Sequence, residues 1–437
     1  MACMLNCQKR KPRKIDEKDK NQFVERTKNA NHKSLGRSQS LPDLCDGFVN
    51  SEICYTIANG VLEEKMRKHW LDNIRWVTVL IVVIYHLFYM YNAEGIVGVV
   101  GKITSMDVQW FDIFMYIVYP WMMVLLFIVS GISSRLYLEN HTNKEFVRSR
   151  TTKLLVPSTI GLFAFQFIQG YVNMSLGRYG GEFDQAPLFV RYLIMALSGT
   201  GVLWYIQVLW LLSLLLVLVR KIEKDHLWKL CEKTNVIVLI LLGALVWGAA
   251  QILNTPIIVV YRFGLYGCVF FFGYFIFSHD EVIERVKKWF PLFATVACGL
   301  CVAFCIVYFG QNYADVPINR SPLFTLFAWF MSLAIIGGFA RFFNFENNVT
   351  KWFNKRSWGL YVFHYLGLST VALLFGKSES IPTWAIYILS LAASFALGYA
   401  LNEIISRIPF FRWAVLGISK KKPEKVKEIE GNDNVQG

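Results

Sequence analysis

Charged residues are scarce in this sequence: only 17% of its 437 residues are Asp, Glu, Lys or Arg, whereas 55% are hydrophobic. That balance excludes an ordinary soluble domain and predicts an all-α, multipass integral membrane protein. The sequence also has no apolar run of spanning length before about residue 70. We therefore expect no cleavable signal peptide, and the first spanning helix must act as its own insertion signal.

Several motifs of known chemistry are absent as well. The sequence has no Walker-type phosphate loop, no G-x-G-x-x-G, no H-E-x-x-H and no G-x-S-x-G. Nucleotide hydrolysis and soluble serine hydrolysis are therefore unsupported. Its nine cysteines show no paired metal-ligand spacing with histidine, and we predict no metal site.

Long apolar segments fill the middle of the chain. We predict a polar cytoplasmic tail over residues 1–69, a ten-helix membrane domain over 70–406 and a charged cytoplasmic tail over 407–437. The ten expected spans are 70–91, 111–138, 154–171, 201–219, 235–253, 257–277, 290–309, 322–340, 357–376 and 382–405.

Basic residues are distributed unevenly among the loops. Sixteen Lys or Arg residues follow the even-numbered spans and five follow the odd-numbered ones. Because basic loops stay in the cytoplasm, both termini are predicted to be cytoplasmic. The net charge of +14 is thus attributed to topology, and no nucleic-acid partner is predicted.

Two features of these segments suggest local irregularity or binding. Pro120 and Ser130-Gly131 interrupt the second span, which we expect to be kinked or partly re-entrant. In the N-terminal tail, Arg37 to Pro42 fits an R-S-x-S-x-P pattern that phosphoserine-binding adaptor proteins read, with Ser40 as the phosphorylated residue.

Ionisable residues occur within the first span, Trp70 to Tyr91. Arg75 and His86 are eleven positions apart, which places them within about 20° of the same helix face and about 16 Å apart along the axis. Ionisable groups at bilayer depth are costly and usually line a cavity or pathway. The presence of Arg75 and His86 on one face therefore indicates that the first span has a functional role.

Only two of the seven histidines, His86 and His364, lie inside predicted spans. A neutral imidazole can take a proton from a hydroxyl and pass it on. The alternative is that each histidine only forms a hydrogen bond between helices. For His86 we favour the catalytic interpretation. For His364 the sequence supports the two interpretations equally.

Further cations lie near the ends of the spans. Arg148, Arg150 and Lys153 precede the third span and, with Arg75, could offer a cationic mouth to a phosphorylated donor. Taken singly, each loop cation is also explained by topology. Arg262, inside span six, is not explained by topology. We expect it to line the cavity or to pair with a carboxylate such as Asp112.

Several motifs then occur in an order that resembles the acyltransferase type 3 family of multipass membrane O-acyltransferases. The resemblance covers nearly the whole membrane part and rests on segments Leu71–Arg75 with His86, Leu126–Gly131, Phe146–Pro157, Leu203–Ile206, Phe271–Tyr274 and Ser357–His364. Each segment is weak alone, but the ordered set is specific.

The resemblance implies an acyl-CoA donor, with acetyl-CoA expected, and a hydroxyl acceptor on a carbohydrate or cell-envelope glycan, at the cell membrane. It implies catalytic roles for His86 and Arg75. The other predicted site residues are Arg148, Arg150, Lys153 and Ser130 at the donor and Arg262, Trp204, His364 and Tyr361 at the acceptor or cavity. The alternative function is a non-enzymatic transporter or channel for a polar solute.

Overall fold

The computed structural model describes residues 68–96, 99–177, 185–255 and 260–419, and these residues form helices and loops with no β-strand. The N-terminal tail, including Ser40, and residues 420–437 lie outside the described part. The helices are α4 (His69–Met90), η1 (Trp110–Asp112), α5 (Ile113–Asn140), α6 (Asn143–Arg150), η2 (Thr151–Leu155), α7 (Val156–Ser158), η3 (Leu162–Gln166), α8 (Phe167–Leu176), α10 (Leu188–Ser198), η4 (Gly201–Leu203), α11 (Trp204–Glu223), α12 (His226–Cys231), α13 (Val236–Ala250), α14 (Phe263–Phe275), α15 (Asp280–Lys288), α16 (Phe290–Tyr308), η5 (Ile318–Arg320), α17 (Pro322–Phe342), α18 (Asn348–Phe375), α19 (Thr383–Arg407) and α20 (Pro409–Leu416).

The described residues confirm an all-α membrane protein. Eight helical segments among them are long and apolar enough to cross a bilayer. The fifth and sixth predicted spans correspond to shorter apolar helices, α13 with 15 residues and α14 with 13. Apolar sequence continues between these two helices, but residues 260–262 are not helical, so the sequence predicted more spanning helix there than forms.

The third span contains irregular turns, whereas the helix of the second span is continuous. α5 runs without a break from Ile113 to Asn140 through Pro120, so the expected re-entrant break is wrong. The segment Asn143–Leu176 instead contains two π-helical turns, η2 and η3, on either side of α7. Pro157 lies in α7, and its ring cannot accommodate the carbonyl four residues earlier, which explains the wider turn that precedes it.

Two glycines allow α5 and α14 to approach closely. A Cβ atom at Gly131 would lie 2.0 Å from the Phe270 carbonyl oxygen, and one at Gly273 would lie 2.1 Å from the Ile128 carbonyl oxygen. The Ser130-Gly131 motif therefore marks the contact of α5 with α14, not a break in α5. Small residues have the same role in other membrane helix pairs, because they let the backbones touch.

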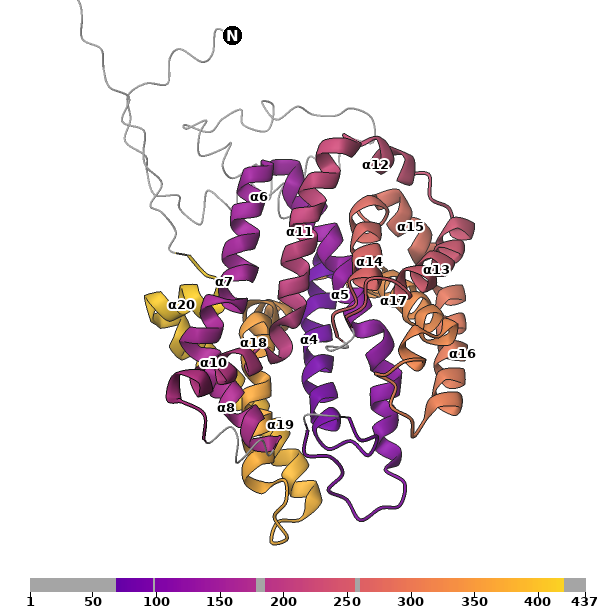
Figure 1. Ribbon diagram of the computed structural model, residues 1–437. Helices are drawn as coiled ribbons and strands as arrows, with labels where there is room; N and C mark the ends of the chain where they lie inside the picture. The colour runs from indigo at the N-terminus through magenta and orange to yellow at the C-terminus, as the bar shows by residue number, and fades with distance from the viewer. Residues whose placement is uncertain (1–67, 97–98, 178–184, 256–259, 420–437) are drawn as a thin grey trace, which may run out of the picture. The chain divides into compact units, whose positions relative to one another are not determined.

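α4 lies beside α5 near the middle of the helical unit, with α18 and α19 on one side and α14, α16 and α17 on the other (Figure 1). α4 and α18 run in the same direction, since Trp76 stacks on Phe353 and His86 contacts His364 further along both helices. This arrangement places His86 of the first predicted span next to His364 of the ninth.

The region predicted as the C-terminal tail begins with structure. Residues 409–416 form α20, and the Leu416 carbonyl accepts a hydrogen bond of 3.0 Å from the Trp358 indole of α18. Glu403, near the C-terminal end of α19, forms an ion pair with Arg356 of α18, whose Nε lies 3.7 Å from Glu403 Oε1.

Candidate active site

Two imidazoles meet at the contact between α4 and α18. His364 Nε2 lies 3.2 Å from His86 Nδ1, and the two ring centroids are 5.0 Å apart. His364 is fully buried, whereas His86 is only partly buried. The structure therefore brings together the two histidines that the sequence placed in separate spans.

Backbone carbonyls define which nitrogen atoms carry protons. The Val82 carbonyl lies 2.7 Å from His86 Nδ1, and the Tyr361 carbonyl lies 2.9 Å from His364 Nδ1. Because a carbonyl only accepts hydrogen bonds, both Nδ1 atoms must carry hydrogen. In neutral His364, Nε2 is then unprotonated and accepts a hydrogen bond from His86 Nδ1–H. Neutral His86 likewise keeps a lone pair on its own Nε2.

This arrangement suits His86 to act as a base. If His86 Nε2 takes a proton, the ring becomes cationic and its Nδ1–H becomes a stronger donor to His364 Nε2 and to Val82. His364 would then stabilise the imidazolium and fix the orientation of the ring, as the orienting partner of a catalytic histidine does.

Arg75 lies towards the beginning of α4, on the same face as His86. Its guanidinium donates to Asp72 Oδ1 at 2.6 Å and to the hydroxyl of Ser133 on α5. The side chain is 39% exposed. Its distance from His86 along the axis, about 16 Å for eleven residues, separates the cation from the histidine pair.

A second arginine reaches the same turn of α5. Arg150 Nη2 donates to Ser134 Oγ at 3.1 Å, and the guanidinium lies 5.0 Å from the Phe146 ring centroid. Since Ser133 and Ser134 are adjacent, Arg75 and Arg150 approach α5 at neighbouring positions. Two cations predicted on the donor side, Arg75 and Arg150, thus contact adjacent serines of α5.

A groove of about 810 Å³ opens beside Arg150. Arg148 and Lys153, both exposed, also line it, so all three predicted loop cations share one groove. Part of its wall comes from residues 416–419, at the end of α20 and directly after it. The exposed Glu145 also lines the groove, but it caps α6 through Thr142, whose backbone amide donates to it at 2.9 Å.

The predicted serine and aromatic positions are linked by contacts around Tyr205, whose ring centroid lies 6.1 Å from that of Tyr361. Ser130 Oγ and the Tyr205 hydroxyl are 2.7 Å apart. The Tyr361 hydroxyl donates to the Val202 carbonyl, and its ring centroid lies 6.4 Å from that of His364. Trp204 contacts the Tyr205 ring, with centroids 6.4 Å apart. Ser130, Tyr361 and Trp204 therefore belong to one polar and aromatic wall.

Arg262 is almost completely buried and donates to the Asn319 carbonyl. Its guanidinium lies 5.0 Å from the Phe324 ring centroid. It does not pair with Asp112, which accepts from the Gln109 amide at 2.9 Å. Of the two alternatives for Arg262, the ion pair with Asp112 is therefore wrong.

A cluster of tyrosines near His86 was not predicted from the sequence. The Tyr85 and Tyr313 hydroxyls are 3.1 Å apart, and Tyr119 stacks against Tyr85 with centroids 5.8 Å apart. The Tyr365 and His86 ring centroids are 5.3 Å apart. Tyrosine is common in membrane proteins, so only the position of Tyr85 next to His86 could have drawn attention to this cluster.

One carboxyl group lies in the connection that follows α4, outside the spans. Glu94 Oε1 accepts from the Tyr116 hydroxyl at 3.2 Å, while its other oxygen is buried without a hydrogen-bond partner among the described residues. Burial and the nearby Asp112 carboxylate raise the pKa of Glu94 to about 7.

Comparison with known families decides the classification. The acyltransferase 3 family, described as an acyltransferase domain, matches residues 68–403. The chain belongs to this family. The matched region includes α4 and α18 with both histidines, α5 with its serines, and the groove cations. The predicted family membership is therefore confirmed.

A curated relative agrees with this classification. The chain is 22% identical to the glucans biosynthesis protein C of Shigella boydii serotype 4 (strain Sb227) over 389 residues, which covers 83% of this chain and 97% of the relative. No solved structure gives a significant match. Among the described residues, no cluster of three or more His, Cys, Asp or Glu side chains is suitable for a metal ion.

Proposed function

We propose that this membrane protein is an O-acyltransferase that moves an acyl group, with acetyl as the first candidate, from acyl-CoA to a carbohydrate hydroxyl. The observation that carries the proposal is the histidine pair, in which His86 keeps a free Nε2 while its Nδ1–H contacts His364. The family supports the acyl group, and the name of the glucan biosynthesis relative supports the carbohydrate acceptor.

The groove is the proposed binding site for the donor. Coenzyme A carries phosphates, and the groove supplies Arg148, Arg150 and Lys153. Arginine binds phosphate through two parallel hydrogen bonds, whereas lysine acts as a point charge. Arg75 extends this cationic surface along α4. Its distance from the histidines suits it to hold the donor rather than to stabilise an oxyanion beside His86.

The acyl group would then lie near His86. In the proposed reaction, His86 Nε2 takes the proton of the acceptor hydroxyl as the oxygen attacks the thioester carbonyl carbon. The carbon–sulfur bond breaks from the tetrahedral intermediate, and the coenzyme A thiolate takes the proton from His86. His364 stays neutral throughout and stabilises the His86 imidazolium through its Nε2. The products are the ester and free coenzyme A.

The acceptor would occupy the opposite side of the histidine pair. Tyr85, Tyr119 and Tyr365 offer hydroxyls and ring faces there, and Trp204, Tyr361 and Arg262 are proposed to shape the surrounding cavity. We further propose that the groove faces the cytoplasm, where acyl-CoA is available, and that the protein resides in the cell membrane. The distribution of basic loops supports this orientation.

The test of the donor site uses purified protein in lipid nanodiscs with radiolabelled acetyl-CoA and candidate glycans. Arg150→Ala should raise the KM for acetyl-CoA by about tenfold with a smaller effect on kcat, because one charge-assisted contact is lost from the bound donor. Arg341→Ala is the matched control, since Arg341 also lies over an aromatic ring but lies outside the groove.

Equal donor affinity in the Arg150→Ala variant and the wild type would place the donor elsewhere. If none of the tested acyl-CoA and acceptor combinations gives a labelled product, while a polar solute crosses the membrane, the transporter interpretation would replace the proposal.

A further inference from the structure

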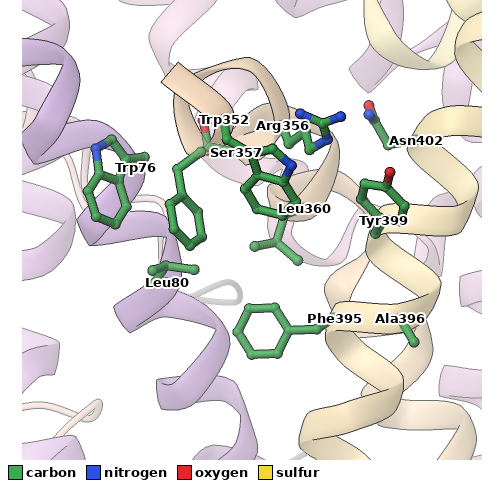
Figure 2. A pocket seen from close by; sticks show the side chains of 11 residues that line it. Trp76, Leu80, Trp352, Arg356, Ser357, Leu360, Phe395, Ala396, Tyr399 and Asn402 are labelled. Carbon is green, nitrogen blue, oxygen red and sulfur yellow. The ribbon is translucent and has the colours of Figure 1, made fainter. Parts of the chain in front are cut away.

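A second pocket lies on another side of α4, between α4, α18 and α19, and has a volume of about 480 Å³. Figure 2 shows aromatic and aliphatic side chains around it, with Leu80 and Phe395 towards one end and Arg356 and Asn402 at the other. Its lining is almost entirely apolar. None of its residues belongs to the donor groove or to the histidine pair.

Stacked aromatic rings hold the pocket in shape. Trp76 and Phe353 stack with centroids 4.6 Å apart, and Trp352 and Tyr399 stack at 6.1 Å. Trp352 and Tyr399 are nonetheless 46% and 45% exposed, so the pocket opens away from the core of the protein. We infer that the surroundings on that side are lipid, because α4, α18 and α19 are all long and apolar enough to span a bilayer.

Arg356 lies at the polar end of the pocket, and its ion pair with Glu403 is loose. Its guanidinium lies 4.7 Å from the Trp352 ring centroid and 5.5 Å from that of Tyr399. Glu403 is 3.7 Å from Arg356 Nε, which is too far for a hydrogen bond, and this buried Nε has no hydrogen-bond partner among the described residues. Lys355, one residue earlier in α18, is exposed and adds positive charge.

We propose that this pocket binds an acyl chain of an anionic phospholipid, with the lipid phosphate at Arg356. The apolar part matches a hydrocarbon chain, and the cation at one end matches a negatively charged headgroup. Basic pockets between spanning helices are known to bind such headgroups. The bound lipid would contact α4 and α18, the two helices that carry His86 and His364.

The geometry of α4 disfavours the acyl chain of the transferred group as the occupant. Leu80 and His86 are six residues apart, which corresponds to about 120° around the helix. Leu80 therefore lines the pocket on a different face from the one that presents His86 to His364. The proposal does not depend on the proposed reaction.

Photo-crosslinking tests the proposal. The full-length protein would be reconstituted in vesicles that contain either phosphatidylglycerol or phosphatidylcholine with a diazirine in the acyl chain, and labelled peptides would be mapped by mass spectrometry. We expect labelling within residues 352–360 and 395–402 to be about fivefold stronger with phosphatidylglycerol, the preference that one basic residue gives at a membrane surface.

Two variants separate the chain site from the headgroup site. Arg356→Gln should reduce phosphatidylglycerol labelling to the level of phosphatidylcholine, whereas Ala396→Trp, which fills the pocket, should remove labelling by both lipids. Arg341→Gln is the control, because Arg341 also lies over an aromatic ring, 5.2 Å from the Phe342 centroid, but outside the pocket.

Three results would overturn the proposal. These are equal labelling by the two lipids in the wild type, unchanged labelling in Arg356→Gln, and displacement of the labelled lipid by saturating acyl-CoA. The last result would make the pocket a donor site. A protein without transferase activity that still shows the lipid preference would refute the proposed reaction and leave the lipid site intact.

Discussion

Replacement of His364 by alanine tests how the histidine pair works. The substitution leaves His86 Nδ1–H with only the Val82 carbonyl as its partner. A hydrogen bond to a charged group contributes about 1.5–3 kcal/mol. The bond between the rings is 3.2 Å, which is long for such a bond, so we take the lower value. We expect kcat to fall about tenfold, because 1.36 kcal/mol corresponds to a factor of ten.

The effect should appear in kcat and not in KM, because the imidazolium forms only during the reaction. Initial rates of coenzyme A release at varied acetyl-CoA and acceptor concentrations measure both constants. His364→Gln is the matched variant, since its side-chain oxygen can accept from His86 Nδ1–H, and it should recover part of the lost rate. Full activity in a folded His364→Ala protein, or equal loss in both variants, would refute this account of the pair.

Two other predictions concern stability. Gly131→Ala should lower the free energy of unfolding by about 3 kcal/mol, because the added Cβ would overlap the Phe270 carbonyl. Gly299→Ala is the control and should be nearly neutral, because its added Cβ meets no atom within 4 Å. Thermal unfolding in detergent measures both variants, and equal melting temperatures would contradict the close contact between α5 and α14. For Glu94, the pKa rises from 4.5 to about 7 on folding, so folding takes up a proton between these pH values. The contribution of Glu94 to the free energy of unfolding is therefore fully present below pH 4.5 and is lost as the pH rises through 7. Glu94→Gln should flatten that decline, and an unchanged profile of melting temperature against pH would show that Glu94 does not cause it.

The sequence predicted the relation of Arg75 to His86 because both lie on one helix, whose period is constant. It did not predict the contact between His86 and His364, which are 278 positions apart. That contact depends on how α4 packs against α18, and residue spacing carries no information about this packing. Only the resemblance to a family placed both histidines in one candidate site.

Errors in the predicted spans also have physical causes. Hydrophobicity over residues 235–277 predicted two full spans, but the backbone at 260–262 is not helical, and α13 and α14 are short. Apolar composition indicates burial in lipid or protein without fixing where a helix ends. Similarly, Pro120 is accommodated within continuous α5, while the third span contains π-helical turns near Pro157.

The central claim is that His86 performs acyl transfer as a base oriented by His364. Its most direct test is the initial rate of acyl transfer by purified His86→Ala protein whose melting temperature matches the wild type. The account predicts a fall of about 10²-fold to 10⁴-fold, the contribution of a general base. A His86→Ala protein that transfers the acyl group at the wild-type rate would contradict it.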